Sequence, residues 1–200
     1  MKIYCATTNR GKFREFQRAF EQWGGGALEL AELPCVWEVP PPAETGRHFE
    51  ENAIQKALYY SAHAPRLLFA EDSGIEVDAL GGEPGVRSAR FAGEGATDAR
   101  NNELLLERLR NAKDRGARYV CVAALAERNR IVEVFRGVVE GEIAEAPRGD
   151  GGFGYDPVFY YPPFGRTFGE ISAEEKMSVS HRGRALAAMI GYLSTRGLGE

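Results

Sequence analysis

The sequence predicts an α/β fold built around a mixed β-sheet with flanking helices. Three observations predict it. Apolar strand-like runs alternate with amphipathic segments of helical period in the first half, and a hairpin pattern follows in the second. The composition, 44% hydrophobic and 27% charged, is ordinary for a folded domain. Alternation favours parallel strands and the hairpin is antiparallel, so we expect a mixed sheet in one domain over residues 1–200.

The first elements follow from local periodicity. Residues 2–7 alternate between apolar and polar and predict a strand. Aromatic side chains from Phe13 to Trp23 then recur at spacings of three and four, which indicates one face of a helix that ends at Gly24–Gly26. Residues 28–39 predict one or two short strands. The three prolines at 40–42 then place a loop, because proline cannot join a central strand.

A helix, a short strand and a second helix are predicted next. Residues 49–64 have helical spacing and end before Pro65. Residues 67–70 are apolar and predict a buried strand that stops at the polar run 71–74. Two glycine-rich turns follow, and residues 97–112 predict a helix with Thr97 as its N-cap.

The second half predicts a hairpin, a loop and a final helix. Residues 119–126 and 131–139 flank a short polar turn, so they should pair antiparallel. The first of these strands is apolar on both faces, which favours a central place in the sheet. Residues 147–157 form a long glycine-rich loop, and residues 180–193 predict the last helix, with Ser180 as its cap.

Composition and charge exclude several classes of protein. The formal net charge of −4 argues against a broad nucleic-acid surface, which requires a basic face. No apolar run approaches the roughly 18 residues of a membrane span, and the apolar patch at the N-terminus is too short for a signal peptide. Cys5, Cys35 and Cys121 lack the spacing of a zinc or disulfide framework and are expected as core thiols. A cytoplasmic location fits these thiols.

The polar loop between the first strand and helix is a candidate phosphate site. Helix N-termini present free N–H groups and the positive end of the helix dipole. A lysine adds charge there, although the spacing is not that of a P-loop and the same residues would also suit an ordinary strand–helix loop. The candidate substrate-binding residues of this loop are Thr7, Thr8, Asn9, Arg10, Gly11 and Lys12.

Carboxylates mark a second candidate site. Glu71 and Asp72 close an apolar strand, where α/β sheets place their ligands, and Ser73 follows them. Adjacent strand residues point to opposite faces, so one acid should face a given cleft while the other supports it. Glu44 lies after the proline-rich loop, and Lys56 lies within the next helix. Together these groups could form a metal–phosphate site, or serve only as turn and helix-dipole residues.

The glycine-rich loop and the last helix supply a third group. Aromatic residues on a flexible glycine frame suit a planar base. Basic residues at the start of the last helix oppose the helix dipole, which indicates a functional demand. Structural explanations, an Ω-loop and a solvated helix start, remain open for both. The candidates are Phe153, Gly154, Tyr155, Asp156, Lys176, His181 and Arg182.

Five blocks in this order resemble the inosine triphosphate pyrophosphatase family, the dITP/XTP pyrophosphatases. The blocks are ATTNRGK at 6–12, ETG with FEENA and KA within 44–57, EDSG with EVDALGG, PGV, SARFAG and NN within 71–102, PRG with GFGYDP within 147–157, and EK with SHRG within 175–183. Each block is a weak motif, but five in order are highly specific. Many bacterial members carry aspartate where this chain has Glu71, and a polar residue is common where it has Met177.

The resemblance implies a function, a fold and site roles. The function is Mg²⁺-dependent hydrolysis of non-standard purine nucleoside triphosphates (ITP, dITP and XTP) to the monophosphate and pyrophosphate. The fold is two-lobed around a long mixed sheet with a cleft between the lobes, usually as a homodimer. Asp72 would be catalytic and, with Glu44, would bind the metal. Residues 7–12 would hold the triphosphate, Lys56 and Ser73 would line the phosphate channel, and the third group above would form the base pocket.

Two other functions remain open from the sequence. A pyrophosphatase for another modified or pyrimidine nucleotide would use the same phosphate site. A non-catalytic nucleotide sensor is a different class, and the presence of Glu44, Asp72 and Lys12 argues against it, because a sensor need not keep an acid–base group.

Overall fold

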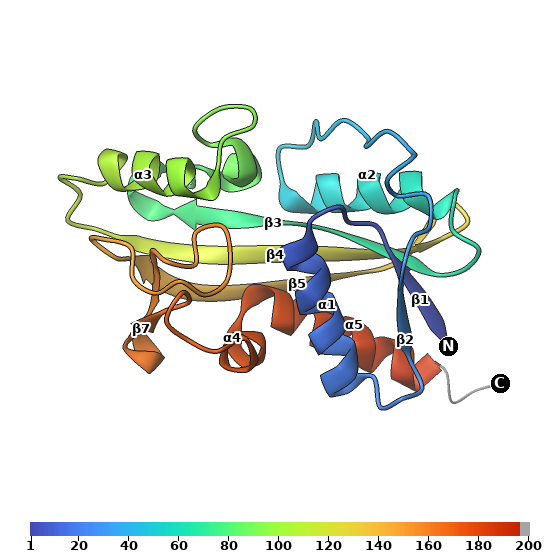
Figure 1. Cartoon of the computed structure of the whole chain (residues 1–200). Coiled ribbons are helices and arrows are strands. Elements are labelled where there is room, and N and C mark those ends of the chain that lie inside the picture. Colours follow the sequence, from blue (N-terminus) through green and yellow to red (C-terminus); the bar gives the residue numbers. More distant parts are fainter. Residues whose placement is uncertain (197–200) are drawn as a thin grey trace.

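One mixed sheet of seven strands runs through the molecule (Figure 1). The computed structural model describes residues 1–196. The strand order is β2-β1-β3-β4-β5-β6-β7, with β2-β1-β3 parallel and the remaining pairs antiparallel, which confirms the predicted α/β class and mixed sheet. The strands are β1 Lys2–Cys5, β2 Glu29–Glu32, β3 Leu68–Val77, β4 Gly116–Glu127, β5 Arg130–Ile143, β6 Phe159–Tyr161 and β7 Arg166–Thr167.

Helices cover both faces of the sheet. Figure 1 shows α2 and α3 on one face and α1, α4 and α5 on the other. Short 3-10 turns η1 (Asp78–Leu80), η2 (Gly85–Arg90) and η3 (Pro162–Phe164) complete the fold. The helices are α1 Arg10–Trp23, α2 Phe49–Ser61, α3 Asp98–Arg108, α4 Ala173–Val179 and α5 His181–Arg196.

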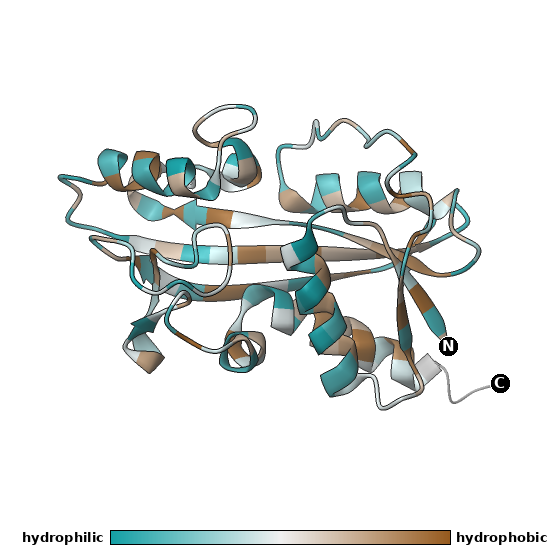
Figure 2. Ribbon diagram, in the orientation of Figure 1, coloured by the Kyte–Doolittle hydropathy of each residue, from teal (hydrophilic) through white to brown (hydrophobic). Residues whose placement is uncertain are grey.

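The core lies between the long strands and these helices. Strand β4 is buried at nearly every position, as expected of a strand that is apolar on both faces. The long strands carry the hydrophobic bands of Figure 2, and the helices turn hydrophilic stripes outward. Cys5 and Cys121 are buried free thiols, and the half-buried Cys35 packs against the core. No helix in residues 1–196 combines the length and apolar character that crossing a membrane requires.

Most predicted elements are confirmed, but one boundary is wrong. The strand expected to stop at Ala70 continues to Val77, and β4 pairs with all ten of its residues. The apolar pattern breaks inside the strand because its polar side chains face the site described below. Gly74 is required there, since a Cβ would lie 2.2 Å from Ser88 Oγ and 2.8 Å from the Gly85 carbonyl oxygen. Strands β6 and β7 and helix α4 are too short to show a periodicity and were not predicted.

Helix caps fall where the sequence indicates. Thr97 accepts a hydrogen bond from the Arg100 amide at 3.2 Å, which confirms it as the N-cap of α3. Ser180 Oγ accepts from the Gly183 amide at 3.1 Å at the start of α5, as predicted. Ser180 also ends α4, so α4 and α5 meet there and bring Lys176 beside His181 and Arg182.

Candidate active site

The site forms where the sheet opens. Strand β1 pairs with β3 only at Tyr4–Leu68 and Cys5–Phe69, whereas β3 continues alongside β4 to Val77. Further along, Ser88 Oγ accepts from the Ile75 amide at 2.9 Å. The segment from Glu71 to Gly74 therefore has no strand beside it on the β1 side. The chain leaves the sheet after β1 and enters α1. Side chains on both faces of this unpaired edge of β3 therefore border a single cleft.

Glu71 and Asp72 point to opposite faces of this edge, as the sequence predicts. Glu71 contacts Lys12 of α1 and Arg182 of α5, whose helices share one face of the sheet. Asp72 contacts two side chains of α2 on the other face, Asn52 and Lys56. The two carboxylates thus divide the cleft into two halves.

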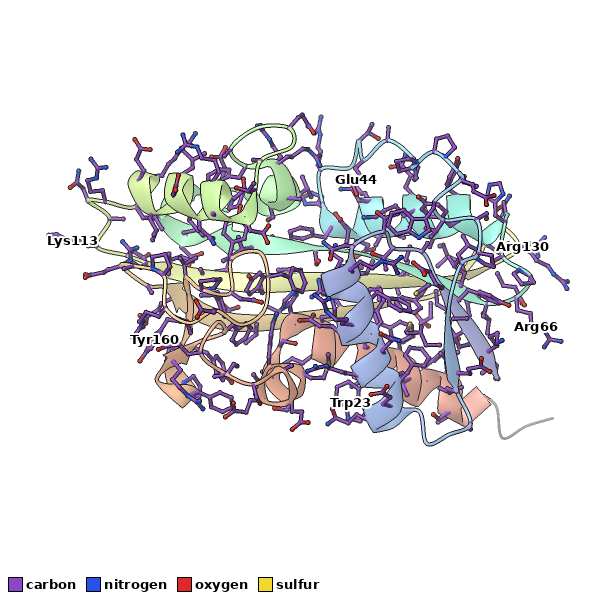
Figure 3. All side chains as sticks on the ribbon, in the orientation of Figure 1. Trp23, Glu44, Arg66, Lys113, Arg130 and Tyr160 are labelled. Atoms are coloured by element: carbon purple, nitrogen blue, oxygen red, sulfur yellow. The ribbon has the colours of Figure 1, made fainter. Side chains whose placement is uncertain are left out.

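The α2 half holds a second carboxylate. Lys56 Nζ lies 2.8 Å from Asp72 Oδ1 and 2.9 Å from Glu44 Oε1, so one ammonium bridges both acids. Asn52 Nδ2 donates to Asp72 Oδ2 at 3.1 Å, and Asn52 Oδ1 accepts from the amide of Gly46 at 2.8 Å, which ties the loop before α2 to Asp72. Figure 3 shows Glu44 on the α2 side of the sheet.

Electrostatics separate the groups of this half. Burial raises the pKa of Asp72 above its ordinary value, and Lys56 and Asn52 offset only part of that effect. Burial would also raise the pKa of Glu44, but Lys56 and Arg90 hold it below its usual value. Burial would lower the pKa of Lys56, yet Asp72 and Glu44 raise it. The pKa values of the two carboxylates are therefore shifted in opposite directions.

Two carboxylates that converge on one cation fit the chemistry of a magnesium site. Mg²⁺ binds hard oxygens, commonly from one or two carboxylates together with substrate phosphates and water. Glu44 and Asp72 supply such a pair at the position of the Lys56 ammonium. Within residues 1–196, no three His, Cys, Asp or Glu side chains gather to hold a metal by themselves. The donor set thus fits a cation that arrives with the phosphates of a substrate.

The α1 half contains the predicted phosphate loop. Asn9 caps α1 by accepting from the Lys12 amide at 3.0 Å, and Lys12 Nζ lies 2.5 Å from Glu71 Oε1. Thr7 Oγ1 accepts from the Asn9 amide at 3.2 Å, and Thr8 is exposed. The predicted loop therefore places the N-terminus of α1 and one lysine at the cleft.

Arg10 turns away from this cleft. Its guanidinium pairs with Glu32 of β2 at 3.2 Å and lies 4.9 Å from the centre of the Trp37 ring. Gly11 instead lies against the glycine-rich loop, because a Cβ there would be 2.8 Å from the ring of Phe153. Only Asn9 and Lys12 of the six predicted residues line the cavity next to the cleft.

That cavity has a volume of about 100 Å³ and gathers all seven predicted base-pocket residues. It joins the start of α1, strand β3, η2, α3, the glycine-rich loop, α4 and α5, which are far apart in the sequence. The ring of Phe153 lies 4.8 Å from Lys176 Nζ and 5.6 Å from the Arg182 guanidinium carbon. The predicted residues that line the cavity are Asn9, Lys12, Ser73, Phe153, Gly154, Tyr155, Asp156, Lys176, His181 and Arg182.

A buried network of charges forms the floor of the cavity. Glu15 of α1 lies 2.7 Å from Lys176 Nζ and 2.5 Å from Arg182 Nη1. Lys176 also lies 2.5 Å from Asp156 Oδ2, and Arg182 donates to Ser73 Oγ at 2.8 Å. Burial would lower the pKa of Lys176, but Asp156 and Glu15 raise it, so the ammonium stays charged. Both cations are therefore held in fixed positions.

His181 is neutral and has a free ring nitrogen. Its ring stacks on Tyr119 with centroids 4.5 Å apart and planes 6° apart. Burial, with Arg182 and Lys176 nearby, moves the pKa of His181 well below its ordinary value. Among residues 1–196, His181 Nδ1 and Arg182 Nε are buried polar atoms that find no hydrogen-bond partner. Buried groups of this kind are costly unless a ligand satisfies them.

Comparison with known proteins identifies the family. The model of the Ham1 family matches residues 3–192. This chain belongs to the Ham1 family. Its relatives include dITP/XTP pyrophosphatases of Syntrophobacter fumaroxidans, 48% identical over 92% of this chain and 78% of that protein, and of Thermus thermophilus, 48% identical over 95% and 90%.

Solved structures of Ham1 proteins share the fold. The HAM1 protein of Coxiella burnetii is 39% identical, with a TM-score of 0.86 over 98% of this chain and 99% of that chain. The nucleoside-triphosphatase / dITP/XTP pyrophosphatase of Mycobacterium abscessus is 43% identical, with a TM-score of 0.74 over 94% and 98%. Both likenesses cover nearly the whole of this chain.

Several residues of this Ham1 site were not predicted as site residues. Glu15 lies one helical turn after Lys12, and its role depends on α4 and α5, which no local pattern places beside α1. Asn52, in the first turn of α2, was not singled out from the sequence, and its side chain donates a hydrogen bond to Asp72. Arg90 pairs with Glu44 at 3.2 Å from across the cleft. Glu50 and Glu51 precede Asn52 in the sequence, and beside these two charged residues Asn52 does not stand out as a site residue.

Proposed function

We propose that this protein hydrolyses ITP, dITP and XTP to the nucleoside monophosphate and pyrophosphate, with Mg²⁺. The observation that carries this proposal is the continuity of the site along the open edge of β3. The base-sized cavity with the free polar atoms of His181 and Arg182 adjoins Lys12, and the buried carboxylate of Asp72 lies around the same strand edge. The names of the family's relatives support the same substrate class.

The floor of the cavity favours a 6-oxopurine. Hypoxanthine and xanthine present an oxygen acceptor where adenine presents an amino donor. Arg182 Nε is a donor without a partner in the described residues, and Lys176 is a buried ammonium beside it. An adenine amino group would meet these donors without an acceptor, and a site built on hydrogen bonds can discriminate by about 10⁴ or more. The Phe153 ring, flanked by both cations, is placed to stack on the base.

Asp72 is proposed as the general base. Burial raises the pKa of this carboxylate, and Lys56 and Asn52 hold its two oxygens in place. A water oxygen attacks the α-phosphorus, its proton passes to an Asp72 oxygen, and the bond between the α-phosphorus and the bridging oxygen breaks. Pyrophosphate leaves with that oxygen, and Lys12 and Lys56 offset its negative charge.

We further propose that Glu44 and Asp72 hold the Mg²⁺. When bound, the ion would offset negative charge on the phosphates of the substrate. This assignment rests on the pair of carboxylates around one ammonium.

A substrate panel tests the function. Pyrophosphate release is measured with ITP, dITP, XTP, GTP, ATP, CTP and UTP, with Mg²⁺ and with EDTA. Metal-dependent release led by the first three supports the proposal. Release led by another nucleotide would retain the phosphate site and reject the base pocket. A folded protein that binds nucleotides but releases no pyrophosphate would be a sensor.

Substitution of Asp72 tests the mechanism. Asp72→Asn keeps the shape and the contact with Lys56 but removes the proton acceptor, so we expect kcat to fall by at least about 100-fold. Circular dichroism would check that the variant folds. Asp114→Asn, a surface change outside the site, is the matched control. A folded Asp72→Asn variant with near-normal kcat would contradict the role of Asp72.

The assembly and location of the enzyme are proposed from the family resemblance and the thiols. We propose a homodimer in the cytoplasm, where the free thiols of Cys5, Cys35 and Cys121 would stay reduced. Sedimentation analysis would measure the mass of the assembly, and a mass of one chain at micromolar concentration would reject the dimer.

A further inference from the structure

Helix α3 holds the glycine-rich loop from across the base cavity. The Gly154 amide donates to Asp98 Oδ2 at 2.7 Å, and the Gly154 carbonyl accepts from Asn102 Nδ2 at 3.0 Å. Asp98 and Asn102 lie one turn apart on α3, so they hold both polar groups of one residue. Gly154 needs a positive φ of 64°, which glycine adopts without strain.

We propose that Asp98 and Asn102 are positioning residues that keep the loop closed over the purine base. They are named here the Gly154 latch. This inference rests on the proposed function, because the base is the ligand over which the loop closes. The latch would act through the loop on base affinity and selectivity, and it would leave the phosphate chemistry at Asp72 unchanged.

The burial of Asn102 argues that its contact serves more than helix stability. The residue is 6% exposed, and its Oδ1 atom is buried and finds no partner in the described part of the chain. A half-satisfied buried amide costs free energy, and an apolar residue would stabilise α3 better at this position. Its one hydrogen bond goes to Gly154. A local choice that costs stability without local gain indicates a functional demand.

The residues on either side of Gly154 connect the latch to the base cavity, because both line it. Phe153 precedes Gly154, and its ring lies against Gly11, Lys176 and Arg182. Tyr155 follows, and its hydroxyl donates to the Ser88 carbonyl of η2 at 2.7 Å. The loop is thus anchored from α3 and η2 at two successive residues. A shift at Gly154 would move the Phe153 ring along the face of a bound base.

Hydrogen exchange and steady-state kinetics test the latch together. Asp98→Ala and Asn102→Ala each remove one hydrogen bond, worth about 1 kcal/mol, so we expect about a fivefold rise in KM for ITP with kcat within about twofold of the wild-type value. Amide exchange in residues 152–156 of the free protein should be about fivefold faster. The ITP/ATP ratio of kcat/KM should fall by a similar factor.

Two variants separate positioning from a general structural effect. Asp98→Asn loses the same charge in the first turn of α3 as Asp98→Ala but keeps an oxygen acceptor. Its KM for ITP should therefore lie close to the wild-type value. Glu103→Ala lies on the same helix, pairs with Arg100 at 3.0 Å and makes no hydrogen bond to the loop, so it should behave as wild type.

Opposite outcomes overturn the latch. The latch would be rejected if the alanine variants lowered kcat and left KM unchanged. It would also be rejected if amide exchange in the loop did not change, or if Asp98→Asn were as impaired as Asp98→Ala. If wild-type protein releases no pyrophosphate from any nucleotide, the proposed function fails, and the exchange measurement on the free protein still decides whether α3 orders the loop.

Discussion

Removal of the Glu71 charge tests how the cations in the α1 half of the cleft are held. Glu71→Gln keeps the size of the side chain but removes the negative charge that faces Lys12 at 2.5 Å and Arg182 at 3.4 Å. The side chain is 2% exposed, so solvent cannot replace the lost carboxylate. Arg182 keeps Glu15 at 2.5 Å, whereas Lys12 has no other ion pair among the described residues.

The expected loss of stability follows from that difference. Breaking a buried ion pair by removing one partner costs about 3–5 kcal/mol, and the low end applies because Lys12 is one-fifth exposed. A loss of about 3 kcal/mol lowers Tm by about 6–12 °C in a domain of this size. In the variant, no Glu71 carboxylate competes with a substrate phosphate for the Lys12 ammonium. We therefore expect KM for ITP to stay unchanged or fall.

The pH dependence adds a second measurement. Burial would raise the pKa of Glu71, but Lys12 and Arg182 hold it well below its ordinary value of 4.5. The stabilisation is therefore fully present above about pH 4.5 and is lost as pH falls through the folded-state pKa. The gap in unfolding free energy between wild type and Glu71→Gln should be constant from pH 7 to pH 5 and should shrink below pH 4.5.

Urea denaturation followed by circular dichroism measures this gap at each pH. Glu140→Gln is the matched control, because Glu140 is 69% exposed in its 3.2 Å pair with Arg118 and should cost at most about 1 kcal/mol. Equal stabilities of wild type and Glu71→Gln at pH 7 would refute the reasoning, as would a gap that does not narrow in acid.

Two further predictions concern buried residues of the same cleft. The pKa of His181 lies below its unfolded value of about 6.5, so only the unfolded chain gains this proton as pH falls below 6.5. The unfolding free energy should then fall by up to about 1.4 kcal/mol per pH unit, and His181→Gln should remove this pH dependence in denaturation experiments. The same substitution should lower the ratio of kcat/KM for ITP to kcat/KM for ATP. An unchanged pH dependence and an unchanged ratio would contradict both roles. Gly74→Ala should cost about 1–3 kcal/mol, because its Cβ would displace Ser88 from the Ile75 amide; an unchanged urea midpoint would disprove that packing.

Local pattern predicted the elements whose period is long enough to read. The helix that begins near Lys12, the hairpin of β4 and β5 and the caps at Thr97 and Ser180 all depend on neighbours within one turn or one strand pair. The end of β3 was wrong for a physical reason. Its polar run EDSG does not bury apolar surface, yet ten pairings with β4 and the counter-charges around Glu71 keep it extended.

The site was predictable as a set of residues but not as a set of contacts. The predicted residues that line the cavity come from four separated segments, and their order along the chain matched a known family. Glu15 could not be assigned, because its two partners lie more than 160 residues away and reach it only when α4 and α5 pack against α1. Arg10 is predicted at the triphosphate, and its guanidinium pairs with Glu32 of the adjacent edge strand in the structure.

The open edge of β3 explains how two adjacent acids acquire different chemistry. On a fully paired strand, side chains that alternate between faces would serve two separate sites. Because β1 ends at Cys5, this edge of β3 is left without a neighbouring strand, and both of its faces border the cleft. Glu71 then meets two cations on the α1 and α5 face, so it stays ionised and fixes them, whereas burial on the α2 face raises the pKa of Asp72 and suits it to accept a proton. Exchange of the two environments, and not of the two residue types, would exchange their roles.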